Sequence, residues 1–138
     1  MRNLDSLILE LNNIHGSEFM KMPFDQIQYI QNKFSDMPDD LFYLYTKLGY
    51  GCVGSSRYMI HALIDPDEIY DSQIAKALDG CLIVGEDFSG NCEAYKAKNG
   101  WVFGVVDCNG QFTSYSPNYK SIVEFLYDWF VEAEPNKL

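Results

Sequence analysis

The sequence predicts an α+β fold in which helices at both ends of the chain pack against an antiparallel β-meander. Apolar residues recur at helical spacing before residue 50 and after residue 120, and the stretch 81–115 is rich in strand-forming residues. Asn-Gly dipeptides interrupt that stretch twice. A chain of 138 residues has the size of one ordinary domain. We therefore treat residues 1–138 as a single domain, with 134–138 as a short tail.

Three helices are expected in the N-terminal part of the chain. The first ends near Gly16, the second follows Pro23, and the third begins at Pro38, because proline suits the first position of a helix. Gly49 stands where a residue with left-handed backbone geometry would end the third helix. The expected buried stripes are, in order, Leu4, Leu7, Ile8, Leu11 and Ile14; then Ile27, Ile30 and Phe34; then Leu41, Leu44, Tyr45 and Leu48.

The middle of the chain is expected to combine a strand with a short helix. Residues 57–61 have a strand pattern, and Asp65-Pro66-Asp67-Glu68 then resembles the start of a helix. Asp65 can cap that helix while Glu68 reaches back to complete a capping box. We expect broken helix to continue to residue 78.

Two hairpin turns organise the predicted meander. Strands are expected at 81–87, 92–98, 101–108 and 111–115. Asn99-Gly100 and Asn109-Gly110 each separate two strands by two residues, which favours type I′ turns because both positions tolerate a positive φ. Such turns would pair Cys92 with Asp107, and Gly104 with Tyr115.

This predicted register divides the side chains between the two faces of the sheet. Both faces are apolar, so the sequence leaves open which of them the helices cover. One face would carry Trp101, Phe103, Val105 and Phe112, and the other Tyr95, Val102, Val106 and Tyr115.

The last helix has the clearest start signal in the chain. Ser121 and Glu124 have the spacing of a capping box. A wide apolar stripe follows, formed by Ile122, Phe125, Leu126, Trp129, Phe130 and Ala133. We expect this helix to pack on the sheet or on the other helices.

The charge balance restricts the possible partners. The formal net charge is −10 and the isoelectric point is about 4.4, so nucleic-acid backbones and anionic membranes would be repelled. A basic protein partner would instead be attracted. The N-terminal residues lack the basic start and unbroken apolar run of a secretory signal, so we expect a cytoplasmic protein.

The residue types that carry catalysis do not form a recognisable motif. His15 and His61 are the only histidines, and no G-x-S-x-G motif or phosphate-binding loop is present. The four cysteines lack C-x-x-C spacing, so we expect neither zinc nor disulfides, and buried or half-buried thiols at Cys52, Cys81, Cys92 and Cys108. The sequence therefore predicts no catalytic residue, no metal and no cofactor.

Acidic and aromatic residues near loops are the candidates for a partner surface. Glu86 and Asp87 stand at the end of a predicted strand, and Asp65 and Asp67 belong to a second acidic cluster. Tyrosines that fall off the buried stripes could supply interface area, although they could equally line the core. The candidate partner-binding residues are Glu86, Asp87, Ser89, Asn91, Asp65, Asp67, Tyr50 and Tyr58.

The order of these signals resembles the SUKH superfamily, which includes a yeast regulator of cell-wall synthesis and many bacterial immunity proteins. The residues 37–51, MPDDLFYLYTKLGYG, are similar to its L-P-x-x helix that ends in glycines, and 83–91, IVGEDFSGN, to its strand and acidic loop. Residues 101–107, WVFGVVD, resemble a later strand, and 121–126, SIVEFL, its terminal helix. The resemblance covers about residues 24–133.

Three positions depart from the family pattern. Asn91 stands where the family has an aspartate after the loop glycine, Lys96 where it has a further aspartate, and Met37 where it usually has leucine. These departures put a family-wide role of those acids in doubt, but not the fold.

The resemblance implies a SUKH-like domain that binds a protein and does not catalyse a reaction. Its leading implication is an immunity protein that neutralises a toxin by direct contact. A regulatory or scaffold module of the same fold, which binds a cellular protein, is the alternative. An enzyme that uses Glu86, Asp87 or His61 is a third hypothesis, which requires a pocket that brings these side chains together.

Overall fold

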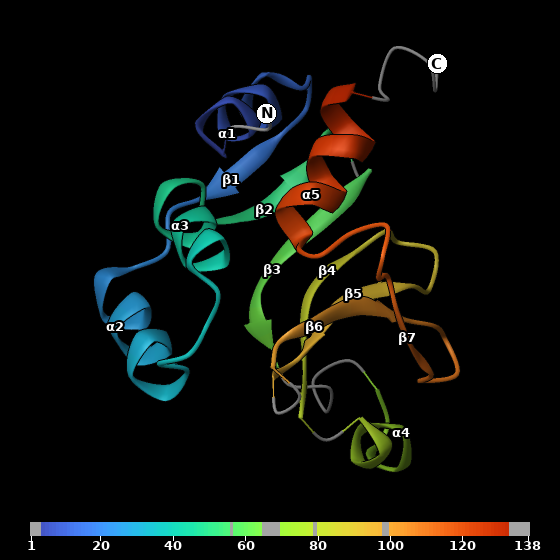
Figure 1. Cartoon of the computed structure of the whole chain (residues 1–138). Coiled ribbons are helices and arrows are strands. Elements are labelled where there is room, and N and C mark those ends of the chain that lie inside the picture. The colour runs from blue at the N-terminus through green and yellow to red at the C-terminus, as the bar shows by residue number, and fades with distance from the viewer. Residues whose placement is uncertain (1–3, 56, 65–69, 79, 98–99, 133–138) are drawn as a thin grey trace.

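The computed structural model describes residues 4–55, 57–64, 70–78, 80–97 and 100–132 (Figure 1). It confirms the predicted α+β class, because helices from both ends of the chain pack on a seven-stranded antiparallel sheet whose strand order follows the sequence. The helices are α1 (Leu4–Asn13), α2 (Phe24–Lys33), α3 (Asp39–Lys47), α4 (Ser72–Ala77), α5 (Ile122–Tyr127) and the π-helical turn η3 (Asp128–Glu132). The strands are β1 (Glu18–Met20), β2 (Tyr50–Val53), β3 (Tyr58–Ile64), β4 (Cys81–Glu86), β5 (Cys92–Lys96), β6 (Val102–Val106) and β7 (Phe112–Ser114).

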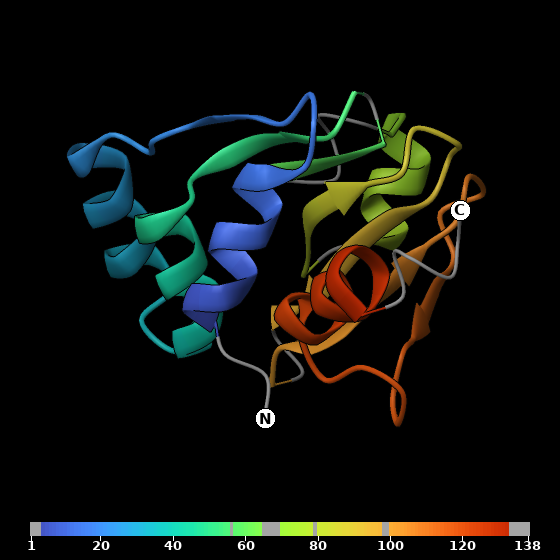
Figure 2. The ribbon, with the colours of Figure 1, turned by 90° about the horizontal axis from the view of Figure 1, so that it is seen from above.

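The helices cover the two faces of the sheet unequally. Helices α1, α3 and α5 lie over one face, whereas α4 lies on the other, as the view from above makes plain (Figure 2). The larger core fills the space under α1, α3 and α5, and a small second core joins α4 to β4, β5 and β6. Burial of each large apolar side chain in these cores contributes roughly 1.5–3 kcal/mol.

Two strands of the sheet were not predicted from the sequence. Strand β1 pairs with β2, and β2 pairs with β3, so the meander begins at residue 18 instead of residue 57. Gly49 lies between α3 and β2 with a φ of +92°, and a Cβ at this position would overlap the carbonyl of Met20. The glycine that ends the helix therefore also allows the close approach of β1.

The predicted register of the last three strands is wrong by one residue. Cys92 pairs with Val106 and not with Asp107, and Gly104 pairs with Ser114 and not with Tyr115. Strands β5 and β6 are also shorter than predicted, and Lys98, expected to end the strand, and Asn99, expected in the turn, lie outside the described residues.

The side chain of Asp107 explains the shift at the second turn. Its Oδ1 accepts the backbone N–H groups of Asn109 and Gln111, both at 2.9 Å, while its own N–H donates to the carbonyl of Gln111. Gly110, with a φ of +81°, closes the loop. The loop therefore holds three residues between Asp107 and Gln111, and the two-residue turn that Asn-Gly favours does not form.

A shift of one residue moves side chains to the opposite face of a sheet. Tyr95 is the direct partner of Phe103, so both belong to the face under α5, together with Trp101 and Tyr115. Phe112 lies instead on the face that α4 covers, beside Val106. The predicted division of the faces was therefore wrong for Tyr95, Tyr115 and Phe112.

The C-terminal helix begins as predicted but ends differently. Ser121 accepts the backbone N–H of Glu124 at 3.3 Å, and Glu124 accepts the N–H of Lys120 in place of that of Ser121. Trp129, expected in the buried stripe, is 42% exposed. It lies in η3, where the wider π-helical winding changes the direction of the side chains that follow α5.

Among the described residues, helix α4 begins at Ser72. Asp71 caps it, because its side chain accepts the backbone N–H of Ile74 at 3.0 Å. Asp65, Pro66, Asp67 and Glu68 lie outside the described residues, so their predicted cap is not tested.

Candidate binding site

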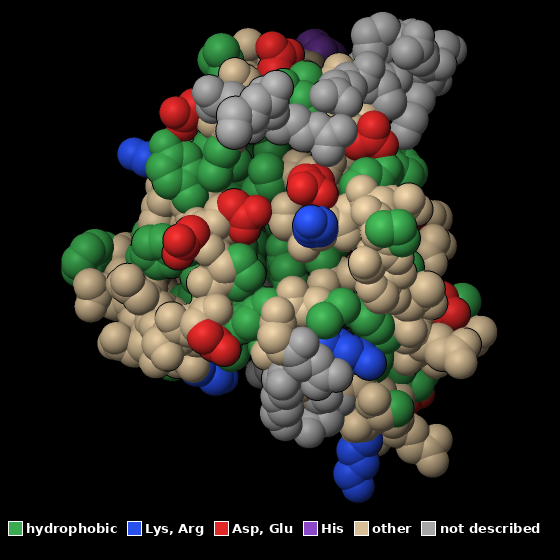
Figure 3. Space-filling model, in the orientation of Figure 1, with side chains coloured by type: hydrophobic (Ala, Val, Ile, Leu, Met, Phe, Trp, Pro, Cys, Tyr) green, Lys and Arg blue, Asp and Glu red, His purple; other side chains and the backbone are tan. Residues whose placement is uncertain are grey.

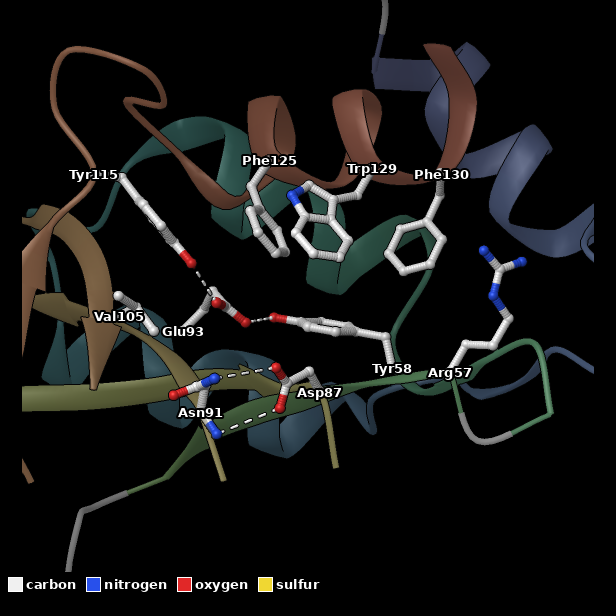
Figure 4. Close-up of a pocket in the computed structure, with 10 residues that line it drawn as sticks. All are labelled: Arg57, Tyr58, Asp87, Asn91, Glu93, Val105, Tyr115, Phe125, Trp129 and Phe130. Carbon is white, nitrogen blue, oxygen red and sulfur yellow. Dashed lines mark hydrogen bonds between the residues drawn. The ribbon is translucent and has the colours of Figure 1, made fainter. Parts of the chain in front are cut away.

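A cleft of about 370 Å³ opens between the C-terminal helical segment and the sheet (Figure 4). One wall comes from α5 and η3, and the floor from β3, β5 and β6. Its lining residues are Arg57, Tyr58, Asp87, Asn91, Glu93, Val105, Tyr115, Phe125, Trp129 and Phe130. The cleft is thus mainly aromatic, with a few polar groups, as ligand sites commonly are.

Glu93 forms the polar centre of this cleft. The residue belongs to β5 and is only 3% exposed. Its Oε1 accepts the hydroxyl of Tyr58 and its Oε2 accepts the hydroxyl of Tyr115 at 2.7 Å, as the dashed lines in Figure 4 show. Burial raises the pKa of Glu93 to about 7, although the two hydrogen bonds act in the opposite direction. Glu93 is therefore close to half ionised at neutral pH.

The two phenols remain protonated when they bind this carboxylate. Burial, followed by the proximity of Glu93, raises the pKa of both Tyr58 and Tyr115 above the ordinary value of a tyrosine. Each can therefore donate a hydrogen to Glu93 at any physiological pH.

Gly85 makes the contact between Tyr58 and Glu93 possible. It is the direct partner of Glu93 across β4 and β5, and a Cβ on Gly85 would overlap the Tyr58 hydroxyl. The phenol on β3 can therefore reach across β4 to the carboxylate on β5 only because this position carries no side chain.

Aromatic rings form most of the remaining walls. Phe125 packs against both tyrosines, with ring centroids 5.7 Å from Tyr58 and 5.6 Å from Tyr115. Trp129 lies 5.3 Å from Phe125, and the guanidinium of Arg57 lies 5.2 Å from the centre of Phe130. Arg57 is found at the Phe130 side of the cleft, on the opposite side from Tyr115 (Figure 4).

Asp87 reaches the cleft from the loop after β4. Its Oδ1 accepts the backbone N–H groups of Ser89 at 2.9 Å and Asn91 at 3.3 Å. Its Oδ2 lies 3.5 Å from Nδ2 of the Asn91 side chain. Partial burial raises the pKa of Asp87, but these hydrogen bonds lower it by more, so the pKa lies below its usual range. Asp87 therefore holds the loop in place and adds a second negative charge near Glu93.

The residues expected to form one partner surface are distributed over different parts of the molecule. Asp87 and Asn91 line the cleft, but Glu86 does not. Glu86 is the register partner of Met59 on β3 and of Cys92 on β5. Its Oε1 lies 3.1 Å from Nε2 of His61, on the face of the sheet opposite α5. The three side chains of the proposed enzyme are therefore not brought together in this cleft.

The two candidate tyrosines, Tyr58 and Tyr50, lie in different surroundings. For Tyr58 the second alternative holds, because its ring lines the core and is 2% exposed. Tyr50 is half-buried at the start of β2 and packs against the main core without reaching the cleft. Ser89 is exposed in the loop, and Asp65 and Asp67 lie outside the described residues.

Glu93 was not among the residues predicted from the sequence, although its pKa is the most strongly shifted of the carboxylates in the described residues. A signal was present: Cys92-Glu93-Ala94-Tyr95 places a glutamate in an otherwise apolar strand, on the same face as Tyr95. A buried carboxylate in such a strand needs hydrogen-bond partners, and the tyrosines that supply them come from distant parts of the sequence.

The acidic and thiol side chains do not form a metal site among the described residues. Within the described ranges, no group of three or more His, Cys, Asp and Glu side chains is arranged to hold a metal ion. The cysteines are free thiols, of which Cys81 and Cys92 are buried and Cys52 is half-buried, as expected, whereas Cys108 is exposed, against expectation. In the part of the chain that the structure describes, no helix has the length and apolar character to cross a membrane.

Comparisons with known proteins add no relative to this description. A scan against models of protein families finds no match, and a search of curated proteins finds none either. The likeness to the SUKH superfamily therefore depends on the motifs quoted above and on the α+β fold class with which they agree.

Proposed function

We propose that this chain is a non-catalytic binding protein that neutralises a bacterial toxin by direct contact with a basic domain of that toxin. The observation that carries the proposal is the acidic character of the face formed by α1, α3 and α5. Acidic residues outnumber basic ones by 20 to 10 in the whole chain. On this face carboxylates lie among hydrophobic side chains (Figure 3), and a protein interface combines an apolar centre with a polar rim.

Several of these carboxylates come from different helices. Asp5 on α1 accepts the hydroxyl of Tyr43 on α3 at 2.6 Å. Asp40 on α3 and Glu124 on α5 are both near enough to Tyr95 to raise its pKa, after the larger effect of burial. The three helices therefore combine their negative charge on one surface.

Charge of this kind favours a basic partner in two ways. It speeds the encounter with an oppositely charged domain, and it discourages binding to acidic proteins. A toxin domain that attacks nucleic acid is expected to be basic, since it must bind phosphates. An acidic protein that covers its active cleft would block it and would need no chemistry of its own. Such an antitoxin would act in the cytoplasm of the cell that makes the toxin.

Co-expression with the C-terminal domain of the protein encoded beside this chain tests the proposal. We expect the chain to restore growth to cells that express the toxin domain and to co-purify with it as a defined complex. Asp5→Lys combined with Asp40→Lys should weaken the complex about tenfold or more, since charge reversal changes attraction to repulsion at two positions. Glu18→Lys is the matched control, because Glu18 is exposed on edge strand β1, away from this face.

Two results would contradict the proposal. One is the failure of the chain to bind or inhibit any toxin domain encoded beside it. The other is an equal loss of affinity for the control and the test variants, which would mean that the acidic face has no special part. Isolation of a housekeeping protein as the sole stable partner would favour the regulatory module instead.

A further inference from the structure

The aromatic cleft around Glu93 has an unusual balance of charge. Carboxylates buried in proteins are normally paired with a cation, because an isolated charge is costly in a low-dielectric interior. Among the described residues, Glu93 forms no ion pair and is bonded by two neutral phenols. Its two oxygens offer about four acceptor positions, so two hydrogen bonds leave further capacity.

The walls of the cleft also suit a cation. Ring faces carry negative electrostatic potential, and a guanidinium or ammonium group within about 6 Å of a ring centre is attracted to it. Arg57 already uses the face of Phe130 in this way, at 5.2 Å. Tyr58, Tyr115 and Trp129 also line the cleft with Glu93, and Asp87 adds a second negative charge at the rim (Figure 4).

The size of the cleft limits what can enter. Its volume of about 370 Å³ is near the lower end of the roughly 300–1,000 Å³ that ligand pockets span. A cleft of this size suits one extended side chain better than a nucleotide or another large cofactor. The exposed side of Trp129 forms part of its mouth, so the cleft is reached from the surface.

We propose that this cleft receives one lysine or arginine side chain of the protein partner, with the Glu93 carboxylate as its counter-charge and the surrounding aromatic rings as its walls. The proposal rests on the proposed function, since it names the group by which a basic partner would be anchored. Arg57 lies at the far end of the cleft from Tyr115, so the incoming cation would occupy the Tyr115 side, near Asp87.

A short peptide tests this cleft separately from any toxin. The probe is acetyl-Gly-Lys-Gly-amide, and the matched neutral probe has norleucine in place of lysine. We expect the lysine peptide to shift amide NMR signals of the cleft residues and to lower the pKa of Glu93, followed by carbon-13 NMR of its carboxylate. The norleucine peptide should cause neither change.

Three variants identify the groups that hold the cation. Glu93→Gln keeps the shape of the side chain and should weaken the lysine peptide about tenfold or more, as loss of a buried counter-charge does. Trp129→Ala, at a partly exposed position, should weaken it several-fold. Glu86→Gln, outside the cleft, should have no effect. Arg57→Gln should leave affinity unchanged or improve it, because Arg57 repels a cation.

The outcomes separate this inference from the proposed function. Equal binding of the norleucine peptide, weaker binding in Arg57→Gln, or no binding at all would overturn the cation site. A toxin complex unaffected by Glu93→Gln would likewise overturn it while the proposed function stood. Binding of the lysine peptide without any toxin complex would uphold the cation site and overturn the proposed function.

Discussion

Asp87 and Asp107 occupy equivalent positions in two loops that share one hydrogen-bond pattern. In each loop the backbone N–H of the aspartate donates to the carbonyl four residues later, and its Oδ1 accepts the N–H groups two and four residues later. Gly90 and Gly110 stand at matching positions, both with positive φ. The two aspartates therefore fix the length of the loops and, with it, the registers of β5 and β7.

Loss of either aspartate side chain should destabilise the fold. Asp107→Ala removes two hydrogen bonds to a charged group, and we expect the free energy of unfolding to fall by about 1–3 kcal/mol. Asp87→Ala should cost a similar amount, whereas Asp→Asn at either position should cost less, because an acceptor oxygen remains. Urea unfolding measures these differences. An alanine variant as stable as the parent at both positions would show that the loops do not depend on these side chains.

The pH dependence of stability should report the burial of Glu93. Its pKa is raised to about 7 in the folded state, against about 4.3 for an unperturbed glutamate. The folded state therefore binds the proton more tightly, so this contribution to stability is present below about pH 4 and is lost as pH rises through about 7. The loss amounts to about 4 kcal/mol at most, at 1.36 kcal/mol for each unit by which the folded and unfolded pKa values differ.

Glu93→Gln should remove this component of the pH dependence. Because glutamine stays neutral, the variant should lose less stability than the parent between pH 4.5 and 8. Urea unfolding at several pH values tests the difference, and Glu86→Gln serves as a control outside the cleft. Parallel pH profiles for the parent and Glu93→Gln would mean that Glu93 is not buried as described.

Each of the two tyrosine hydroxyls should lower the pKa of Glu93. Both hydrogen bonds favour the ionised carboxylate, so Tyr58→Phe and Tyr115→Phe should raise the pKa of Glu93 further. Carbon-13 NMR of the Glu93 carboxylate measures it directly. Tyr43→Phe is the control, since the Tyr43 hydroxyl binds Asp5 at the surface. A fall in the pKa of Glu93 in either test variant would contradict this hydrogen-bonding scheme.

Replacement of Gly85 should disturb the cleft more than replacement of another glycine. Gly85→Ala places a methyl group against the Tyr58 hydroxyl, and such overpacking costs about 1–3 kcal/mol. Gly100→Ala has open space around its Cβ but a φ of +81°, so it costs about 1–2 kcal/mol through the backbone alone. Only Gly85→Ala should also change the pKa of Glu93. An unchanged pKa would show that Tyr58 reaches Glu93 without this glycine.

The elements that depend on local patterns were predictable from the sequence. Helical stripes, the prolines before α2 and α3, and the Ser121 cap all act within a few residues, and the structure places helices there. Strands β1 and β2 are three and four residues long. An alternating pattern of so few residues cannot be recognised in the sequence, and these segments become strands only through pairing with β3.

The cleft was less predictable because its parts meet only in three dimensions. The register of β7 depends on the Asp107 side chain, whose hydrogen bonds replace the two-residue turn favoured by Asn109-Gly110, and an error of one residue exchanges the faces. The hydrogen bonds of Glu93 join it to Tyr58 and Tyr115, which come from separate segments of the chain. No local sequence pattern therefore predicts these contacts. The exposure of Trp129 likewise depends on the π-helical winding of η3, which apolar spacing does not predict.

Isothermal titration calorimetry of the purified chain with the toxin domain encoded beside it tests the central claim most directly. We expect a defined stoichiometry and an affinity that weakens as ionic strength rises. We also expect a loss of about tenfold or more in Glu93→Gln, as truncation of a buried charge pair produces. The absence of binding at low ionic strength would contradict the account, as would an affinity that responds neither to salt nor to the loss of the Glu93 charge.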